Sequence, residues 1–319
     1  MTIKSTHRVE VVPVRLEPHP NADTLSIVRV WNYVCVVRTD DFRDVPLAAY
    51  VPPDSVVPAT PLFAFLGESR RIKVRRFRGV VSQGLLVRAP EGAKLGDDVA
   101  GLLGVTRYDP PLEIRSTGEP ERPPPLTIPE YDVEDWHRYG HVFREGEEVV
   151  ALEKIHGANA RFVWLEDRFW AGSRKEWKRD DPKIVWWSAL RACPWLEEFL
   201  RANPGLVVFG EAYGRVQDLR YGLGHQIRVA VFDLYENGRF LDWDSARERG
   251  RGLEWVPVLH RGPYDPARLK EISNGPSTVP GANHAREGVV IRPVVERGDP
   301  EIGRVQLKIV SDAYLERAR

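Results

Sequence analysis

Short runs of alternating apolar and polar positions characterise the first hundred residues of the chain. The pattern predicts strands at residues 9–16, 26–37, 71–77 and 84–88. A proline-rich bend at residues 52–58 separates the first two strands from the others. Several short strands at this spacing are typical of a small β-barrel. We therefore expect residues 1–108 to form one OB-like β-barrel module.

The rest of the chain alternates apolar runs with polar turns. Strands are predicted at residues 148–152, 160–166, 206–210, 227–235, 288–293 and 304–309. Helical spacing occurs at residues 183–192 and 194–202, and Pro194 suits the first turn of a helix. We expect residues 130–319 to form a domain of antiparallel β-sheets flanked by helices, which makes the fold class α+β.

Prolines crowd the segment between these two parts. Pro110, Pro111 and Pro120 are followed by three consecutive prolines at residues 123–125. Such a segment has few backbone donors and resists regular structure. Residues 109–129 are therefore predicted to be a linker.

Composition narrows the class of protein. The 46 basic residues balance the 46 acidic ones, so any attraction to nucleic acid must come from local patches. Cys35 and Cys193 are too few for a disulfide framework, which favours a cytoplasmic location. No apolar stretch approaches the roughly 20 residues of a membrane span. We expect a soluble monomer with no membrane contact and no obligate protein partner.

The candidate chemistry starts at Lys154. This lysine follows the apolar run 149–152 and precedes Gly157, so a strand end would hold its amine and the glycine would let a phosphate approach. A lysine attacks phosphorus only after losing a proton, which a nearby cation or a desolvating pocket encourages. By itself, however, a lysine three residues before a glycine is more often a solvated turn.

The run from Glu153 to Asn159, with Ile155, His156 and Gly157 inside it, resembles the first motif of type 2 RNA ligases, which belong to the covalent nucleotidyltransferase superfamily. Further segments resemble that family's later motifs in the same order. They are Ser173 with Arg174, Phe209 to Glu211, Val231 to Asp233, Glu287 to Ile291, and Leu307 with Lys308.

The resemblance implies a role for each motif residue. Lys154 would accept AMP from ATP, Phe232 would stack on adenine, and Glu211 would bind a ribose hydroxyl. Charge on the phosphates would be offset by Arg174, Lys308 and a Mg²⁺ or Mn²⁺ ion, which Glu287 would bind directly or through water. The residues expected to contact the nucleotide beside Lys154 are Glu153, Ile155, Gly157 and Asn159. His156 would either touch the nucleotide or form a hydrogen bond behind it.

Two features qualify this interpretation. The family's motif V usually has two lysines separated by one residue, but Gln306 stands where the first would be. Without the flanking motifs, moreover, Phe232 would be taken for a core residue, and Glu211 and Glu287 for solvated residues at strand ends.

The N-terminal module carries a resemblance of its own. The segments 18–25 and 79–85 resemble OB-fold tRNA-binding modules attached to some aminoacyl-tRNA synthetases. Together with the segment 307–314, this resembles a clade of bacterial RNA ligases, the Deinococcus-type enzymes, in which an OB-like module precedes the catalytic domain.

A basic segment in this module is a candidate for RNA binding. Six cations lie between residues 70 and 78, and on one strand Arg71, Lys73 and Arg75 would share a face suited to a phosphate backbone. A charged edge strand that discourages aggregation would show the same pattern.

The predicted function is an ATP-dependent RNA ligase that joins 3′-hydroxyl and 5′-phosphate ends through a lysyl-AMP intermediate. The resemblance implies a nicked duplex with RNA on the 3′-hydroxyl side. Two alternatives stay open. One is a GTP-dependent capping enzyme or a DNA ligase, and the other is a non-catalytic RNA-binding protein.

Overall fold

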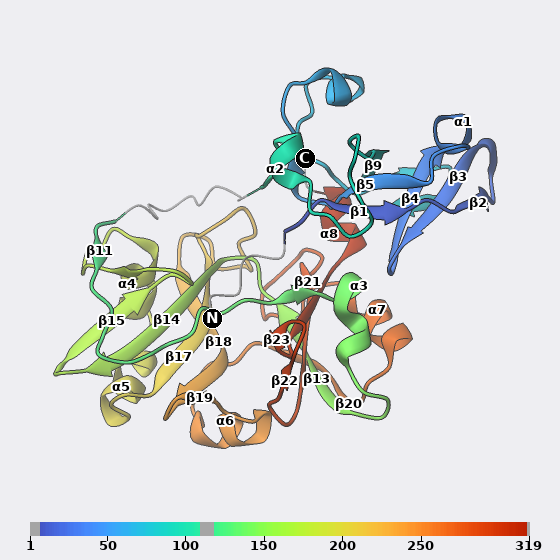
Figure 1. The fold of residues 1–319 in the computed structure, drawn as a ribbon. Coiled ribbons are helices and arrows are strands. Elements are labelled where there is room, and N and C mark those ends of the chain that lie inside the picture. The colour runs from blue at the N-terminus through green and yellow to red at the C-terminus, as the bar shows by residue number, and fades with distance from the viewer. Residues whose placement is uncertain (1–6, 109–117, 318–319) are drawn as a thin grey trace. The chain divides into compact units, whose positions relative to one another are not determined.

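The computed structural model describes residues 7–108 and 118–317, which fall into two compact units (Figure 1). The first unit comprises residues 1–110 together with 312–319, and the second comprises residues 111–311. The expected catalytic domain ran to residue 319, whereas the C-terminal helix α8 (Asp312–Arg317) is part of the first unit.

The first unit is built from short antiparallel strands around two apolar clusters. One sheet contains β1 (Glu10–Pro13), β5 (Leu47–Val51) and β9 (Leu85–Arg88). Another contains β2 (Leu16–His19), β3 (Ala22–Val30) and β4 (Tyr33–Arg38). Two small pairs join β6 (Ser55–Val56) to β10 (Thr106–Arg107), and β7 (Arg75–Phe77) to β8 (Val80–Ser82). The short helices are α1 (Thr39–Phe42), the 3₁₀ helix η1 (Pro61–Leu66) and α2 (Ala100–Leu103).

Two strand predictions in this unit were wrong in part. The strand expected at residues 26–37 is interrupted by a turn at Trp31, whose φ is 52°, so β3 and β4 form a hairpin. Of the strand expected at residues 71–77, only β7 is a strand, and Arg71 makes an isolated bridge to Val56 instead.

The described residues of the second unit form two large sheets and one two-stranded pair. The seven-stranded sheet has the order β11-β16-β15-β14-β17-β18-β19 and is antiparallel. Its strands are β11 (Pro120–Glu121), β14 (Ala158–Leu165), β15 (Arg168–Gly172), β16 (Trp177–Lys178), β17 (Val207–Gly214), β18 (Ile227–Glu236) and β19 (Arg239–Phe240). Helices α4 (Val185–Arg191) and α5 (Pro194–Ala202) pack on one face, and α6 (Trp243–Arg249) follows β19. Because β11 pairs with β16, part of the expected linker belongs to this sheet.

The five-stranded sheet has the order β12-β24-β21-β13-β20. Its strands are β12 (Glu134–Asp135), β13 (Glu148–Lys154), β20 (Val258–Pro263), β21 (Gly288–Pro293) and β24 (Leu307–Val310), with only the β12–β24 pair parallel. Helices α3 (Trp136–Tyr139) and α7 (Pro266–Ser273) cover one face, and the 3₁₀ helix η2 (Gly140–Val142) follows α3. The short strands β22 (Gly298–Asp299) and β23 (Gly303–Arg304) form a separate pair.

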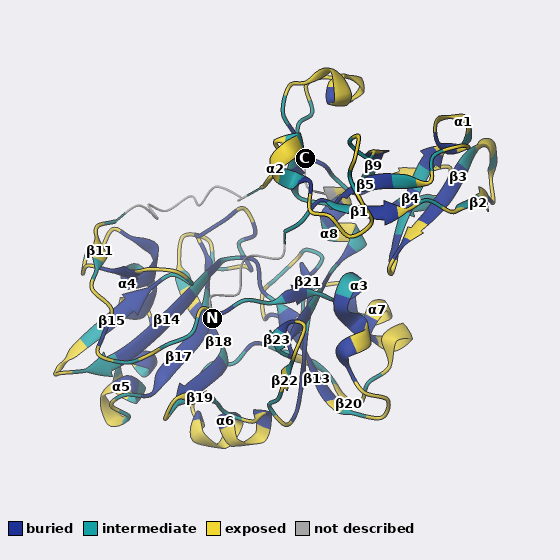
Figure 2. Cartoon of the chain, viewed as in Figure 1, coloured by how far each residue is buried: buried dark blue, intermediate teal, exposed yellow. Residues whose placement is uncertain are grey.

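Side-chain alternation places the candidate site residues Lys154 and Lys308 on the face of the five-stranded sheet opposite α3 and α7. Val149 and Ala151 of β13 lie in the core under α3 and α7. Since neighbouring strand residues point to opposite faces, Lys154 is on the other face. Leu307 and Ile309 are core residues in the same way, which puts Lys308 on the same face as Lys154. Figure 2 shows how deeply the central strands of both sheets are buried, while α6 is mostly exposed.

A buried charge network connects the two sheets. Asp233 in β18 accepts hydrogen bonds from Arg292 in β21 at 2.9 Å and from Arg304 at 2.6 Å. Asp233 and Arg292 are both fully buried. Tyr131 adds a hydroxyl donor to Asp233 at 2.9 Å, and Glu296 pairs with both arginines. The sheets are therefore joined by ionic contacts as well as by apolar packing.

Neither Cys35 nor Cys193 forms a disulfide, and both are buried. Over the described residues, the structure contains no helix that is long and apolar enough to cross a membrane.

We expect Asp233→Asn to lower the free energy of unfolding by about 3–5 kcal/mol, because it removes one of the two carboxylates that balance Arg292 and Arg304 in the interior. Urea unfolding measures the change. The matched control is Glu254→Gln, which removes the exposed Arg228–Glu254 ion pair and should cost less than about 1 kcal/mol. Equal costs for the two variants would contradict a stabilising role for Asp233.

Candidate active site

Lys154 and Glu287 form an ion pair. Lys154 lies on the face of the five-stranded sheet opposite α3 and α7. Lys154 is the last residue of β13 and is the register partner of Gly288 in β21, so the neighbouring Glu287 lies beside it. The distance from Lys154 Nζ to Glu287 Oε1 is 2.5 Å. The lysine side chain is 26% exposed and the glutamate side chain 11%, so the pair is shielded but reachable from solvent.

Two glycines make this close arrangement possible. A Cβ at Gly157 would lie 2.1 Å from the carbonyl oxygen of Ala212, and one at Gly288 would lie 2.0 Å from that of Ile309. Both neighbours are backbone atoms that cannot move aside easily. The glycines therefore let β17 and β24 pack directly against the segments that carry Lys154 and Glu287.

Glu211 supplies a second carboxylate near the lysine. Desolvation raises the pKa of Glu211 to about 8, and the charge of Glu287 acts in the same direction. Burial also opposes ionisation of Glu287, but Lys154 and His156 outweigh it and lower the pKa of Glu287 to about 2. The surroundings therefore favour the ionised form of Glu287 and the protonated form of Glu211.

His156 connects the pair to a loop. Its Nε2 lies 2.8 Å from Asp218 Oδ1, and its Nδ1 lies 3.6 Å from Glu287 Oε2. Its backbone N–H donates to the hydroxyl of Tyr221 at 2.7 Å. His156 therefore lies between Glu287 and Asp218. Asp218 and Tyr221 were not predicted, since they come from a loop with no recognisable motif.

Glu153 points away from Lys154. Its carboxylate accepts hydrogen bonds from Ser277 Oγ at 2.5 Å, and from the backbone N–H and hydroxyl of Thr278 at 2.8 and 2.6 Å. Glu153 is 2% exposed and Ile155 is 3% exposed. Both had been predicted to contact the nucleotide, but the carboxylate of Glu153 holds the loop after α7.

Asn159 and Phe232 lie on the seven-stranded sheet. Asn159 is the register partner of Glu211, and its Oδ1 is a buried acceptor with no hydrogen-bond partner among the described residues. Phe232 occupies a β-bulge of β18, between Val231 and Asp233. A bulge turns side chains out of the regular alternation, and Phe232 is only half-buried, with its ring 4.7 Å from that of Tyr131.

The remaining motif residues differ in their surroundings. Arg174 pairs with Asp132 at 2.7 Å. Lys308 lies in β24 opposite Val290 and is partly exposed.

Gln306, which replaces the first motif V lysine, is 2% exposed and donates to the hydroxyl of Tyr131 at 2.5 Å. Because Tyr131 also donates to Asp233, Gln306 belongs to the charge network that joins the sheets.

The donor set suits a hard divalent cation. Among the described residues, no group of three or more His, Cys, Asp or Glu side chains could hold a metal by itself. Mg²⁺, however, is usually bound by one or two carboxylates together with water and substrate phosphates. Glu287 and Glu211 provide two such carboxylates, and the raised pKa of Glu211 reflects their mutual repulsion as well as burial.

The predicted basic ladder of the first unit is not present as such. Arg71 is bound to Asp54 at 2.6 Å and its guanidinium lies 3.9 Å from the ring centre of Tyr108. Arg71 is not on a strand with Arg75, because β7 begins at Arg75, so the single strand expected to carry Arg71, Lys73 and Arg75 is not formed. Ile72 and Val74, which lie between them, are buried. Arg75 is exposed and Lys73 is half-buried.

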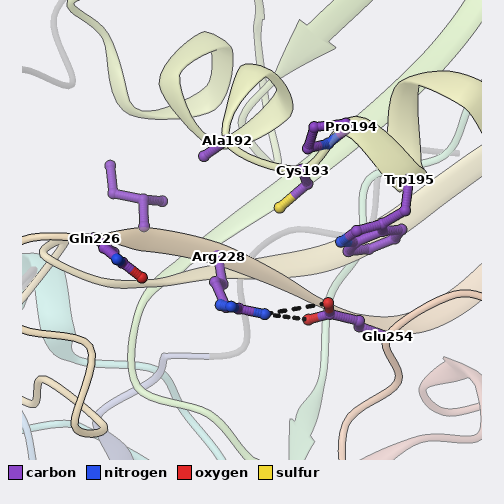
Figure 3. Close-up of a pocket in the computed structure, with 8 residues that line it drawn as sticks. Ala192, Cys193, Pro194, Trp195, Gln226, Arg228 and Glu254 are labelled. Carbon is purple, nitrogen blue, oxygen red and sulfur yellow. Dashed lines mark hydrogen bonds and ion pairs between the residues drawn. The ribbon is translucent and has the colours of Figure 1, made fainter.

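A separate cavity of about 450 Å³ lies where α4 meets α5 (Figure 3). Cys193 and Trp195 line one side, and the Arg228–Glu254 ion pair lines the other. Burial raises the pKa of Cys193 to about 11, which keeps its thiol protonated. None of the motif residues lines this cavity, so it is not part of the site around Lys154.

Comparison with models of protein families identifies the family of the chain. The model of the RNA ligase family matches residues 147–310, which is more than half of the chain and includes Lys154, Glu211, Glu287 and Lys308. The chain belongs to the RNA ligase family. An OB-fold domain model matches residues 7–89 of this ligase, in agreement with the expected N-terminal module. The α+β prediction is thereby confirmed. A search of curated proteins gives no match.

Solved structures show the same fold over the whole ligase. A Naegleria gruberi RNA ligase variant in the apo state has a TM-score of 0.81 at 22% identity, covering 98% of both chains. A variant of that enzyme with ATP and Mn has a TM-score of 0.80 at 22% identity, covering 97% of this chain and 98% of the other. The Naegleria enzyme with PPi also has a TM-score of 0.80, at 22% identity and 98% coverage of both chains.

The raised pKa of Glu211 predicts a pH-dependent stability. Between the usual value of 4.5 and about 8, the folded ligase holds a proton that the unfolded chain releases. The contribution of Glu211 to the free energy of unfolding should therefore fall as the pH rises through this window. Glu211→Gln should remove that slope in urea unfolding measured from pH 5 to pH 8, whereas Glu145→Gln, at an exposed site, should keep it. Parallel curves for wild type and Glu211→Gln would refute the assignment.

Proposed function

We propose that the protein is an ATP-dependent RNA ligase that joins 3′-hydroxyl and 5′-phosphate ends through a lysyl-AMP intermediate on Lys154. The observation that supports this most directly is the shielded Lys154–Glu287 pair at 2.5 Å, with Glu211 close enough for both charges to shift its pKa. Segments that are far apart in the sequence supply these groups, as the order of the motifs predicts.

In the first step the ammonium of Lys154 loses a proton to solvent, to which its side chain is 26% exposed. The nitrogen lone pair then forms a bond to the α-phosphorus of ATP. The bond from that phosphorus to the bridging oxygen breaks, and pyrophosphate leaves with the electron pair. Glu287 holds the amine in position before the attack.

In the second step an oxygen of the 5′-phosphate end forms a bond to the phosphorus of the lysyl-AMP. The phosphorus–nitrogen bond breaks, and the lysine nitrogen leaves with the electron pair and takes up a proton from solvent. The 3′-hydroxyl then loses its proton and attacks the 5′-phosphorus, which releases AMP and leaves a phosphodiester. Phe232 would stack on the adenine and Glu211 would bind a ribose hydroxyl. Arg174 and Lys308 would offset the charge of the phosphates.

A divalent cation, Mg²⁺ or Mn²⁺, would stabilise charge on the phosphates and the leaving group. Glu287 would hold it, directly or through water. Binding of the cation should favour ionised Glu211, since a nearby positive charge lowers the pKa of a carboxyl group.

The substrate we infer is a nicked duplex with RNA on the 3′-hydroxyl side, as in the Deinococcus-type clade that the sequence resembles. The OB fold of the first unit supports a nucleic-acid role, because OB folds bind oligonucleotides. Since Arg71 is bound to Asp54, Lys73 and Arg75 are the members of the basic segment that we assign to phosphate contact.

Incubation with α-labelled ATP and Mg²⁺ should label the wild-type protein, whereas Lys154→Ala should take up no label because the nucleophile is absent. Lys175→Ala, which removes an exposed lysine outside the site, should be labelled like wild type. Label is read after denaturing electrophoresis.

This labelling assay, together with assays of nick sealing and RNA binding, separates the alternatives. Preference for α-labelled GTP would indicate a capping-type enzyme. Sealing of nicks with DNA on the 3′-hydroxyl side at an equal rate would indicate a DNA ligase. An unlabelled wild type that still binds RNA would indicate a non-catalytic RNA-binding protein.

For the basic segment, the double variant Lys73→Ala/Arg75→Ala should bind nicked RNA more weakly, and the slope of log K against log salt should fall by about 2. Binding titrations between low and moderate salt measure this. Arg43→Ala/Arg88→Ala, two exposed cations elsewhere in the first unit, is the control. An unchanged slope in Lys73→Ala/Arg75→Ala would exclude the phosphate contacts.

A further inference from the structure

The turn that follows Lys154 connects the two large sheets of the second unit. β13 ends at Lys154 and β14 begins at Ala158, so residues 155–157 form the turn between them. On one side β13 pairs with β20 only as far as Leu152, whereas on the other side its pairing with β21 continues to Lys154 and Gly288. Lys154 is therefore paired with a neighbouring strand on one side only, and the turn limits how far its backbone can move.

Side chains of the loop between β17 and β18 bind the main chain of this turn. The hydroxyl of Tyr221 accepts a hydrogen bond from the N–H of His156 at 2.7 Å. Gln217 Nε2 donates to the carbonyl oxygen of Gly157 at 2.5 Å. The two main-chain groups belong to consecutive residues, so the loop holds the turn at two adjacent points.

Tyr221 is itself held tightly. Its φ is 52°, a left-handed conformation that a bulky residue rarely adopts and that persists only where the surrounding structure fixes it. Its ring packs edge-on against the rings of Tyr213, with centroids 5.3 Å apart, and His284, with centroids 4.5 Å apart. Tyr221 is 1% exposed. Strained residues of this kind cluster at functional sites, which gives Tyr221 a possible role beyond packing.

The hydroxyl of Tyr221 lies in the electrostatic field of the site. Burial raises the pKa of Tyr221 well above its usual value, and the charges of Glu287 and Glu153 act in the same direction. The hydroxyl therefore stays protonated and neutral beside these carboxylates. It can hold the turn without changing the charge around Lys154.

We propose that Tyr221 is a positioning residue for the nucleophile: its hydroxyl fixes the turn 155–157 and thereby the place of the Lys154 amine relative to the α-phosphate of ATP. The inference rests on the proposed function, since it concerns the step in which Lys154 takes up AMP. Tyr221 acts through the main chain of His156 and has no direct part in the chemistry.

Small displacements of a nucleophile have large effects on rate. A shift of about 1 Å at a reacting group can cost on the order of 100-fold. Only two residues after Lys154, the N–H of His156 would lose its partner if the hydroxyl of Tyr221 were removed. A turn freed at this point leaves Lys154 and its charge in the site but places the amine less exactly.

The test is Tyr221→Phe in the full chain, which removes one oxygen atom and keeps the buried ring. The rate of lysyl-AMP formation is measured in single turnovers over a range of ATP concentrations without RNA. We expect the maximal rate to fall about 10-fold, while the ATP concentration for half-maximal rate stays within about twofold, because positioning rather than ATP binding is lost. The melting temperature should also fall, since a buried N–H is left without its partner.

Tyr264→Phe is the matched control for that loss of stability. The hydroxyl of Tyr264 accepts from Trp136 Nε1 and donates to the carbonyl oxygen of Gly140, both at 2.8 Å. These residues belong to the α3 side of the five-stranded sheet, whereas Lys154 is on the opposite face. Tyr264→Phe should lower the melting temperature as well, but its maximal rate of lysyl-AMP formation should stay within about twofold of wild type.

A second measurement bypasses the attack by lysine. The substrate is a nicked RNA duplex whose 5′-phosphate already carries AMP, and the protein is used free of lysyl-AMP. Because Lys154 is not the nucleophile in this step, Tyr221→Phe should seal the nick within about twofold of the wild-type rate.

The outcomes separate this inference from the proposed function. A wild type that takes up no AMP refutes the proposed function. A wild type that is labelled while Tyr221→Phe forms lysyl-AMP at the same maximal rate refutes the positioning role alone. Equal losses in lysyl-AMP formation and in sealing of the adenylylated nick would show general damage to the fold, and would also refute it.

Discussion

The ion pair between Lys154 and Glu287 is the contact on which the geometry and the electrostatics of the site depend. It requires β13 and β21 to be neighbours in register, and it requires glycine at residues 157 and 288, where any side chain would meet backbone. The pair also sets the electrostatics of the site, because Lys154 helps keep Glu287 ionised, whereas Glu287 helps raise the pKa of Glu211. The contact between Lys154 and Glu287 and the opposite pKa shifts of Glu287 and Glu211 therefore depend on one strand register.

The charge network on Asp233 explains why Gln306 stands where the family's motif V usually has its first lysine. Arg292 and Arg304 bring two buried positive charges to Asp233 and Glu296, which balance them. Gln306 contacts the same network through Tyr131. A lysine at this position would add a third positive charge to a balanced group, so a neutral amide suits the site better. Lys308, two residues later, lies on the same sheet face as Lys154 and is partly exposed.

Local signals predicted the parts of the fold that depend on local sequence. The apolar run of β21 and the amphipathic helix α5 begin and end where the sequence predicted. The turn at Trp31 was missed because its two residues, Trp31 and Asn32, include no glycine or proline. The pairing of Arg71 with Asp54 was missed because it depends on tertiary contacts. At the site, the motifs identified Lys154, Glu211 and Glu287, which the structure brings together. Asp218 and Ser277, which bind His156 and Glu153, lie in loops whose sequence has no recognisable motif. The hydrogen bond from Thr278 to Glu153 could be expected only after β13 is known to turn Glu153 toward α7.

The central claim is that Lys154 is the residue that carries AMP. The most direct measurement is peptide mass mapping of the protein after incubation with ATP and Mg²⁺. Our account predicts one added adenylyl group, located on the peptide that contains Lys154. An adenylyl group on a different lysine would contradict it, as would a folded protein that binds ATP and carries no adenylyl group.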